Sequence, residues 1–272
     1  MMKDTISRIG ESTMYKIAFF VEGKTEMLLI ERMIEQFARP NPVYIKMMEA
    51  RGGGKDGRVP LSYKAIGITK QQNNEQFYVL ICDCGGEDNV KPRIDEEHKN
   101  LHEQGYELII GIRDVRPKFG IATLPSLKVI MNTAIDKNLI PVRFILPLAE
   151  VEAWFLSEHT HFPRIHPSIT AQTISQTLGF NPAADDMTIR SNPADDLDDC
   201  YRIGNRAYNK SKAKRTINAL DMNEVRANLP NRIPELKKLV KTVENFFNPP
   251  PTVPPQVALQ PVASNAQPAA EV

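Results

Sequence analysis

Residues 21–26 have the sequence Val21-Glu22-Gly23-Lys24-Thr25-Glu26 and lie between two patterned segments. The apolar run before them predicts a buried strand, and the residues after them carry apolar side chains at a helical spacing. Thr25 is the expected N-cap of that helix. The pattern therefore places Glu22 at the carboxyl end of a strand, on a turn kept small by Gly23. Open α/β sheets bind ligands at this edge, and the alternative for Glu22 is a solvated turn residue.

Acidic side chains also follow the other predicted strands. Asp83 ends a continuous apolar run, as expected for a strand buried on both faces of a parallel sheet. Asp114 follows the strand predicted over 106–112, and Glu152 follows the strand predicted over 142–147. Each has a structural alternative: a helix N-cap for Asp83, a salt bridge to a neighbouring arginine for Asp114, and a charge at a helix N-terminus for Glu152.

Carboxylates at strand ends suit metal-assisted phosphoryl chemistry. Mg²⁺ prefers oxygen ligands, keeps several of its waters and is held by one or two carboxylates together with substrate phosphate. The ion stabilises charge on the phosphoryl oxygens, while a nearby carboxylate moves a proton. The sequence therefore predicts a site that acts on phosphate esters with Mg²⁺ or Mn²⁺.

These motifs resemble the Toprim fold of topoisomerases, primases and OLD-family nucleases. Its first motif is a glutamate followed by glycine after the first strand, which Glu22-Gly23 matches, and the surrounding residues are most similar to the small Toprim-like proteins of phage-defence systems. The second motif is Asp-x-Asp. Asp83 matches its first position, but Gly85 occupies the second. Glu87 or Asp88 is expected to supply the missing carboxylate, or the site is degenerate.

A third segment, Glu150 to Leu156, resembles the Glu-x-Glu-Ala-aromatic stretch that follows the last core strand of small Toprim-like proteins. The resemblance implies that the catalytic residues are Glu22, which acts as the acid/base, and Asp83. It implies that Mg²⁺ or Mn²⁺ ligands come from five carboxylates, Glu22, Asp83, Asp88, Asp114 and Glu152. The implied activity is metal-dependent cleavage of DNA or RNA phosphodiesters, in an antiphage effector that works with a partner ATPase or as a homo-oligomer. Two alternatives stay open: a catalytically silent module that binds nucleic acid or a partner, and a hydrolase of small phosphate esters.

The formal net charge is only +1, but the charges are unevenly distributed. Residues 201–241 carry eleven bases against three acids, a net charge of +8, whereas residues 183–199 carry six acids against one base. The expected contacts to nucleic-acid phosphates are Lys210, Lys212, Lys214 and Arg215, together with Lys55 in a glycine-rich loop. Tyr201 and Tyr208 are expected to stack on unpaired bases. The alternative is that the basic segment pairs with the acidic one.

Alternating strand and helix signals over residues 15–156 predict an α/β fold with a Toprim-like, parallel-rich sheet flanked by helices. The expected elements are strands at 15–21, 43–49, 77–83, 106–112 and 142–147, and helices at 25–38, 60–70, 91–104 and 124–138. Residues 157–248 predict a helical C-terminal region. The Pro/Ala/Gln/Val composition of residues 249–272 predicts a disordered tail, and residues 1–14 form a polar leader.

The composition is ordinary for a soluble globular protein, with 42% hydrophobic and 25% charged residues in a chain of 272. No apolar stretch approaches the roughly 20 residues that span a bilayer, and the N-terminus lacks the apolar core of a signal peptide. No membrane partner is therefore expected. The three cysteines are expected to be reduced thiols in a cytoplasmic protein.

Overall fold

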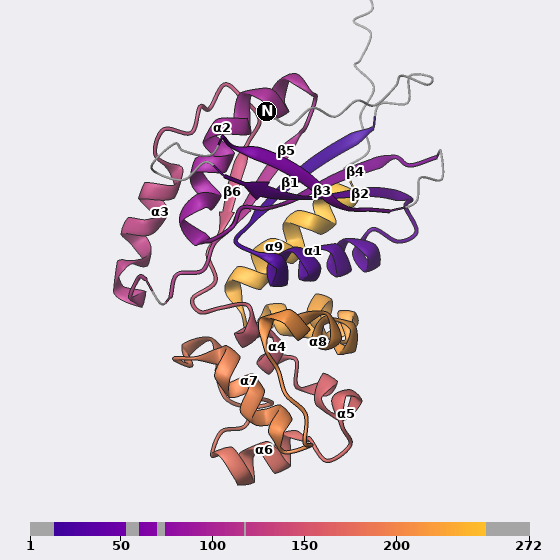
Figure 1. Cartoon of the computed structure of the whole chain (residues 1–272), viewed down its shortest axis with the longest axis vertical. Helices are drawn as coiled ribbons and strands as arrows, with labels where there is room; N and C mark the ends of the chain where they lie inside the picture. The colour runs from indigo at the N-terminus through magenta and orange to yellow at the C-terminus, as the bar shows by residue number, and fades with distance from the viewer. Residues whose placement is uncertain (1–13, 53–59, 70–73, 117, 249–272) are drawn as a thin grey trace, which may run out of the picture.

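The computed structural model describes residues 14–52, 60–69, 74–116 and 118–248, and it has an α/β architecture. Six strands form one sheet in the order β3-β2-β4-β1-β5-β6. Among these described strands, only β3 runs antiparallel to its neighbour. Helices flank both faces of the sheet (Figure 1). The predicted fold class, a parallel-rich sheet flanked by helices, is confirmed.

The strands are β1 (Tyr15–Val21), β2 (Val43–Arg51), β3 (Ser62–Ile68), β4 (Phe77–Asp83), β5 (Leu108–Ile112) and β6 (Val142–Ile145). The helices beside the sheet are α1 (Lys24–Phe37), α2 (Val90–Glu103), α3 (Leu124–Asn132) and α9 (Pro234–Phe247), with the 3-10 turns η1 (Glu87–Asn89) and η2 (Ile121–Thr123). The remaining helices are α4 (Glu152–Ser157), α5 (Phe162–Ile165), α6 (Ala171–Leu178), α7 (Pro193–Arg202) and α8 (Ala213–Ala219). Short turns of other helix types complete this part: η3 (His159–His161), η4 (Met187–Ile189), η5 (Lys210–Lys212), η6 (Glu224–Asn228) and η7 (Leu229–Asn231).

The central strand β1 is buried on both faces of the sheet. Successive side chains of a strand point to opposite faces, so Ile17, Phe19 and Val21 join one hydrophobic cluster while Ala18 and Phe20 join another. The first cluster contains the apolar sides of α1 and α9, and the second contains that of α2. This two-sided burial explains why the strands near the centre of the sheet are continuous apolar runs.

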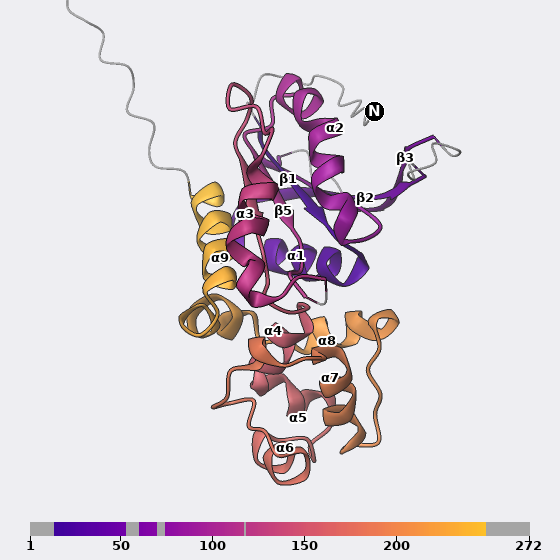
Figure 2. The same ribbon diagram turned by 90° about the vertical axis from the view of Figure 1, so that its left-hand side faces the viewer.

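The chain leaves the middle of the sheet in two directions. The helix after β1, α1, packs on one face, whereas the helix after β4, α2, packs on the other face (Figure 2). The connection through α1 leads to β2 on one side of β1, and the connection through α2 leads to β5 on the other. Such a divergence opens a crevice outside the carboxyl ends of the strands, where ligands bind in open α/β sheets.

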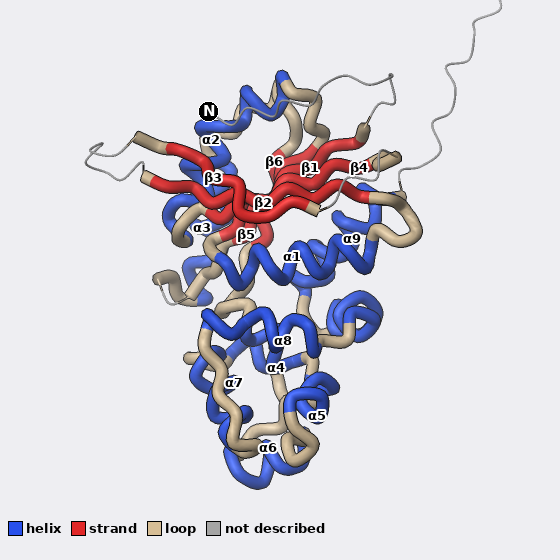
Figure 3. Tube along the Cα trace, turned by 45° about the vertical axis from the view of Figure 1, so that its right-hand side comes forward, coloured by secondary structure: helices blue, strands red, loops and turns tan. Residues whose placement is uncertain are grey.

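The helices α4 to α8 form a second body below the sheet (Figure 3). The chain then returns to the sheet through α9. Phe247 at the end of this helix packs edge-on against Phe77 of β4, with ring centroids 5.0 Å apart. The side chain of Asn41 also donates a 3.1 Å hydrogen bond to the carbonyl of Phe247. One continuous hydrophobic cluster therefore joins the sheet, α1, α9 and the helices of the second body.

The predicted helix at 60–70 is wrong, because this segment forms the edge strand β3. The β-branched residues Ile66 and Ile68 favour a strand, and Gly67 disfavours a helix. Gly67 allows the close approach of β2, since an added Cβ would lie 2.3 Å from the Cε atom of Met47. Thr69 continues the pairing by accepting a 2.8 Å hydrogen bond from the amide of Ile45.

Two helix ends also differ from the prediction. The N-cap of α1 is the extended residue Gly23 and not Thr25, whose side chain is buried. The helix predicted to end at residue 138 ends at Asn132, because Thr133 is extended and Ala134 adopts a left-handed conformation with φ of 61°. The other predicted strands and helices of the α/β part are present, with boundaries shifted by two residues or fewer.

The polar leader and the C-terminal tail expected from composition lie outside the described residues, apart from residue 14. Within the described part of the chain, none of the helices combines the length and the apolar character that crossing a bilayer requires.

Candidate active site

The carboxyl ends of β1 and β4 place Glu22 and Asp83 side by side. Val21, the last residue of β1, is in register with Asp83, and Glu22 follows it directly. The loop after β4 is held against this end of β1 by two backbone hydrogen bonds. The amide of Cys84 donates to the carbonyl of Val21 (2.9 Å), and that of Gly86 donates to the carbonyl of Glu22 (2.7 Å).

The Glu22 side chain reaches the end of β5. Its Oε1 atom accepts a short hydrogen bond from the backbone amide of Asp114. Burial raises the pKa of Glu22 to about 8, although the Asp114 hydrogen bond lowers it; the carboxylates of Glu26 and Glu87 raise it further, and Arg113 lowers it. The structure therefore brings the ends of β1 and β5 together around one half-buried carboxyl group.

Three further carboxylates lie buried around Glu22. The exposed fractions are 6% for Asp114, 5% for Glu26 and 0% for Glu152. Burial raises the pKa of each, to about 7 for Glu26, and Coulombic repulsion from nearby carboxylates, which is that of Glu150 in the case of Glu152, acts in the same direction. The Oδ1 atom of Asp114 and the Oε2 atom of Glu152 have no hydrogen-bond partner. We call Glu22, Glu26, Asp114 and Glu152 the carboxylate cluster.

The segment before α8 closes over this cluster from the second body. The hydroxyl of Tyr208 donates a 2.6 Å hydrogen bond to Oε1 of Glu152, and the ammonium of Lys210 lies 2.8 Å from Oε1 of Glu150. Burial lowers the pKa of Lys210, but its salt bridge to Glu150 and the nearby Glu152 and Glu26 raise it overall. The cluster is therefore built from both the sheet and the helical part of the chain.

Asp83 lies at the margin of the cluster. Its Oδ1 atom accepts a 2.9 Å hydrogen bond from the amide of Gly85. Burial raises its pKa, while this hydrogen bond lowers it and the neighbouring Glu49 raises it. Asp83 is also close enough to Glu26 to raise the pKa of that residue.

Gly85 occupies the second position of the expected Asp-x-Asp pair for a backbone reason. Its φ is +73°, in the left-handed region, and the next residue, Gly86, also has a positive φ. Side chains strain the backbone in this conformation, so glycine is favoured over aspartate here. The predicted substitutes are engaged elsewhere: Asp88 forms ion pairs with Arg113 (3.3 Å) and Lys118, and Glu87 forms one with Lys118 (3.1 Å).

The carboxylate cluster offers the kind of oxygen donor that a hard divalent cation such as Mg²⁺ takes. Buried carboxylate oxygens without a donor are costly, and two of them face this cluster. Within the described part of the chain, no group of three or more Asp, Glu, His or Cys side chains is already arranged as a metal site. Mg²⁺ needs only one or two protein carboxylates, because water and substrate phosphate complete its coordination. Glu22, Asp114 and Glu152 are the residues that would hold it.

The predicted site residues thus have different surroundings. Glu22, Asp114 and Glu152 lie together, Asp83 adjoins them, Asp88 is in ion pairs, and Lys55 lies outside the described residues. Sequence reasoning missed Glu26 as part of the site, although its position in the first turn of the helix that follows Glu22 could have indicated it. It also missed the contact of Tyr208 with Glu152, for which the sequence contains no local signal.

The basic segment differs from the expectation in one respect. Tyr201 and Tyr208 are 0% and 4% exposed, so the prediction that they stack on unpaired bases is wrong. Tyr201 instead donates a 2.9 Å hydrogen bond to Thr216. Lys212 and Lys214 are exposed, and Arg215 is exposed and lies over the ring of Tyr201. None of the four predicted bases, all of them described, forms a salt bridge with the acidic segment 183–199.

Comparisons with known proteins identify no family. No family model matches the chain, and no curated protein is significantly similar to it. One solved structure that aligns with this chain is described as a "putative cell surface hydrolase" from Lactobacillus plantarum WCFS1. It is 11% identical, with a TM-score of 0.29, over 87% of this chain and 92% of that one. A TM-score this low carries no argument about activity.

Proposed function

We propose that this protein is a Toprim-like, Mg²⁺-dependent nuclease that hydrolyses nucleic-acid phosphodiesters. The observation that carries the proposal is a pair of buried carboxylate oxygens within the carboxylate cluster. These oxygens, Asp114 Oδ1 and Glu152 Oε2, accept no hydrogen bond from the residues that the structure describes. They lie at the carboxyl edge of the sheet, next to the point where the connections from β1 and β4 diverge. When bound there, Mg²⁺ would stabilise negative charge on the phosphoryl oxygens.

The side chains of the cluster have distinct roles in this proposal. Glu22 moves a proton to or from the reacting oxygen, because its carboxyl is held by the Asp114 amide at the open edge of the sheet. Asp114 and Glu152 hold the ion, and Asp83 supports it from the neighbouring strand. Lys210 supplies a positive charge for the substrate phosphate beside these acids.

The basic segment supports nucleic acid over a small phosphate ester. Lys212 and Lys214 are exposed on η5 and α8, shortly after Lys210, which forms an ion pair with Glu150 beside the carboxylate cluster. Exposed cations beside a phosphoryl-transfer site bind the phosphates that flank the reacting one, which a small ester lacks. A role in phage defence and a partner ATPase are parts of the proposal that rest on the resemblance of residues 15–156 to small Toprim-like proteins.

A cleavage assay with the full chain tests the proposal. Labelled single- and double-stranded DNA and RNA are incubated with Mg²⁺ or Mn²⁺, and with EDTA as the metal-free control. We expect metal-dependent cleavage that falls by a factor of about 10²–10⁴ in Glu22→Gln, because general acid–base catalysis contributes about that much. Glu103→Gln is the matched control, since this exposed acid ends α2 at the opposite edge of the sheet. Cleavage by Glu22→Gln at the wild-type rate would contradict the assignment.

One observation favours a catalytically silent module as the second candidate. Gly85 replaces an expected aspartate, and its neighbours Glu87 and Asp88 are neutralised by Lys118 and Arg113. A silent module would bind Mn²⁺ and nucleic acid through the same residues but leave every tested substrate intact. Calorimetric Mn²⁺ binding that Asp114→Asn abolishes, without cleavage by the wild-type chain, would select this alternative.

A further inference from the structure

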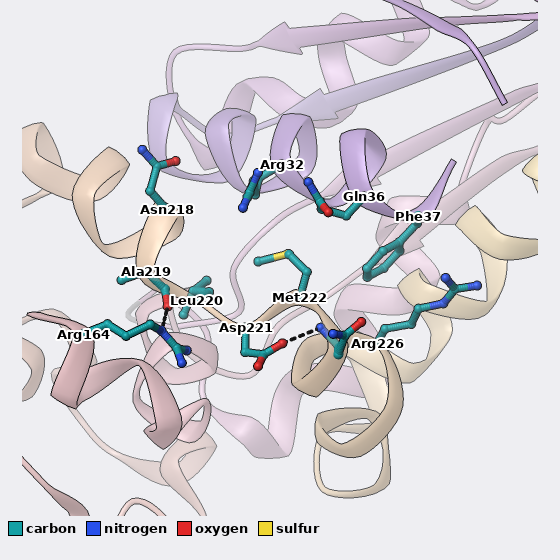
Figure 4. A pocket seen from close by; sticks show the side chains of 11 residues that line it. Arg32, Gln36, Phe37, Arg164, Asn218, Ala219, Leu220, Asp221, Met222 and Arg226 are labelled. Carbon is teal, nitrogen blue, oxygen red and sulfur yellow. Dashed lines mark hydrogen bonds between the residues drawn. The ribbon is translucent and has the colours of Figure 1, made fainter. Parts of the chain in front are cut away.

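A second cavity lies between the sheet part and the helical part, on the side of α1 away from its first turn. It has a volume of about 350 Å³ and is lined by residues of α1, α5, α8 and the loop to η6. Its polar wall consists of Arg32, Gln36, Arg164, Asn218, Asp221 and Arg226. Figure 4 shows Arg32 and Gln36 on α1 facing the segment 218–223 across the cavity.

Arg32 brings an unsatisfied cation to this cavity. Its Nε atom is buried and has no hydrogen-bond partner. Its one ion pair among the residues that the structure describes, with Glu35, is long at 3.8 Å, and the side chains of Arg32 and Glu35 are 33% and 43% exposed. Such an exposed pair contributes little. The guanidinium therefore keeps most of its five N–H donors available.

The other two arginines are anchored by part of their donors. Arg226 forms a 2.6 Å ion pair through Nε with Glu244, and Arg164 donates from Nε to the carbonyl of Ala219 (2.5 Å). These contacts fix the two side chains while leaving further N–H groups of each guanidinium without a described partner. Arg164 also pairs with Glu158 at 3.5 Å, so its charge is partly compensated.

The acids and amides of the wall complete the pattern. Asp221 is the one carboxylate that lines the cavity, and its Oδ1 accepts a 2.8 Å hydrogen bond from the amide of Asn223. The lining thus carries three guanidinium groups against one carboxylate. The carboxamides of Gln36 and Asn218 form no hydrogen bond with any residue that the structure describes, so both can donate to a ligand.

We propose that this cavity binds a phosphate group. Guanidinium groups match phosphate oxygens with paired hydrogen bonds, and carboxamides add neutral donors. The volume lies at the lower end of the range of about 300–1,000 Å³ for small-molecule sites, which suits a phosphate with a small organic group attached. The phosphate comes from a free phosphomonoester such as a nucleotide, or from the backbone of a bound nucleic acid. The inference stands independently of the chemistry at the carboxylate cluster.

The test measures phosphate binding to the full chain in EDTA, which prevents cleavage. Three probes distinguish the two sources: inorganic phosphate, AMP, and a single-stranded oligonucleotide without terminal phosphates. Arg32→Gln removes the guanidinium whose Nε atom has no hydrogen-bond partner among the described residues, and Asn218→Asp places a negative charge at an exposed position of the wall. Arg206→Gln is the matched control, because Arg206 is exposed and its one described hydrogen bond goes to the neighbouring Asn205 carbonyl.

We expect Arg32→Gln to weaken binding about ten- to a hundredfold, as the loss of a charge-assisted hydrogen bond implies. Asn218→Asp should also weaken binding, because the added carboxylate repels phosphate. The control should bind as the wild type does. If inorganic phosphate or AMP binds and the binding depends on Arg32, the ligand of the cavity is a free phosphate compound. If only the oligonucleotide binds, with the same dependence on Arg32, the ligand is a backbone phosphate of nucleic acid. The proposal is overturned if none of the probes binds, or if both pocket variants bind as tightly as Arg206→Gln. Thermal unfolding of each variant confirms that it is folded.

Discussion

At the scale of single residues, the surroundings of the carboxylate cluster disfavour the ionised form of its acids. Glu22 and Glu26 have pKa values raised to about 8 and about 7, in both cases mainly through burial. Asp114 and Glu152 are raised by the same cause, and each has one oxygen without a donor. A folded chain keeps such a group only where its cost is offset elsewhere, which is typical of functional sites.

The raised pKa values predict how stability depends on pH without a divalent metal. The ordinary pKa of these glutamates is 4.5, so above that pH the folded protein binds more protons than the unfolded chain. The stabilisation is therefore fully present below about pH 4.5 and is lost as the pH rises through 7 to 8. Urea unfolding in EDTA should show stability falling from pH 5 to 8.5, by about 1.4 kcal/mol for each unit of pKa shift.

Glu22→Gln should flatten this decline, because the amide has no charge to bury, while Glu103→Gln should retain it. Adding Mn²⁺ should restore stability at pH 8 in the wild type more than in Glu22→Gln. Parallel curves for Glu22→Gln and wild type would show that Glu22 ionises normally in the folded state.

At the scale of elements, the loop between α7 and α8 is attached to the start of α4. Tyr208 donates to Glu152, the first residue of α4, and the backbone amide of Tyr208 donates a 2.7 Å hydrogen bond to Asp198 of α7. Burial and the adjacent Glu152 carboxylate raise the pKa of the Tyr208 hydroxyl, so it keeps the proton that it donates. Tyr208 thus connects α7 to the start of α4 and to the carboxylate cluster.

Tyr208→Phe is predicted to destabilise the protein by about 1–3 kcal/mol, because it leaves both oxygens of the buried Glu152 without a donor. Urea unfolding at pH 7 measures the change. Tyr63→Phe is the matched control, since the hydroxyl of Tyr63 is buried without a hydrogen-bond partner and its loss removes no interaction. Equal stability of the two variants would mean that the Tyr208 hydroxyl contributes nothing to the site.

At the scale of the whole molecule, the second body positions its cations at the edge of the sheet. Lys210 lies against the acids, whereas Lys212 and Lys214 are exposed beside it. The three lysines therefore have two functions in our proposal: Lys210 acts within the site, and Lys212 and Lys214 hold the substrate outside it. This division could not be assigned from their spacing in the chain.

Neutralising Lys212 and Lys214 together should weaken nucleic-acid binding and reduce the slope of log K against log salt by about 1.4–1.8, since each phosphate contact contributes about 0.7–0.9. Fluorescence anisotropy in EDTA between about 50 and 300 mM salt measures both quantities. Lys99→Gln with Lys137→Gln is the charge-matched control, because both residues are exposed and lie outside the basic segment. An unchanged slope in the test variant would place the binding surface elsewhere.

Local sequence patterns determined most of the sheet. The strand predicted at 77–83 has the same bounds in the structure, because burial on both faces requires an unbroken apolar run. The positions of Glu22 and Asp83 at strand ends follow from the same patterns, whereas the tertiary structure makes these two strands neighbours. The edge strand β3 was not predicted. Among the described strands it pairs only with β2 and its side chains are largely exposed, so it does not need the unbroken apolar run that marks the central strands.

Only the tertiary structure decided which acids form the cluster and what closes it. Glu26 joins because the first turn of α1 packs over the strand ends. Tyr208 and Lys210 reach Glu152 and Glu150 across 56 and 60 residues of chain, and no local periodicity encodes such a contact. The raised pKa values have the same origin, because burial depends on everything that packs around a carboxyl group and not on its neighbours in sequence.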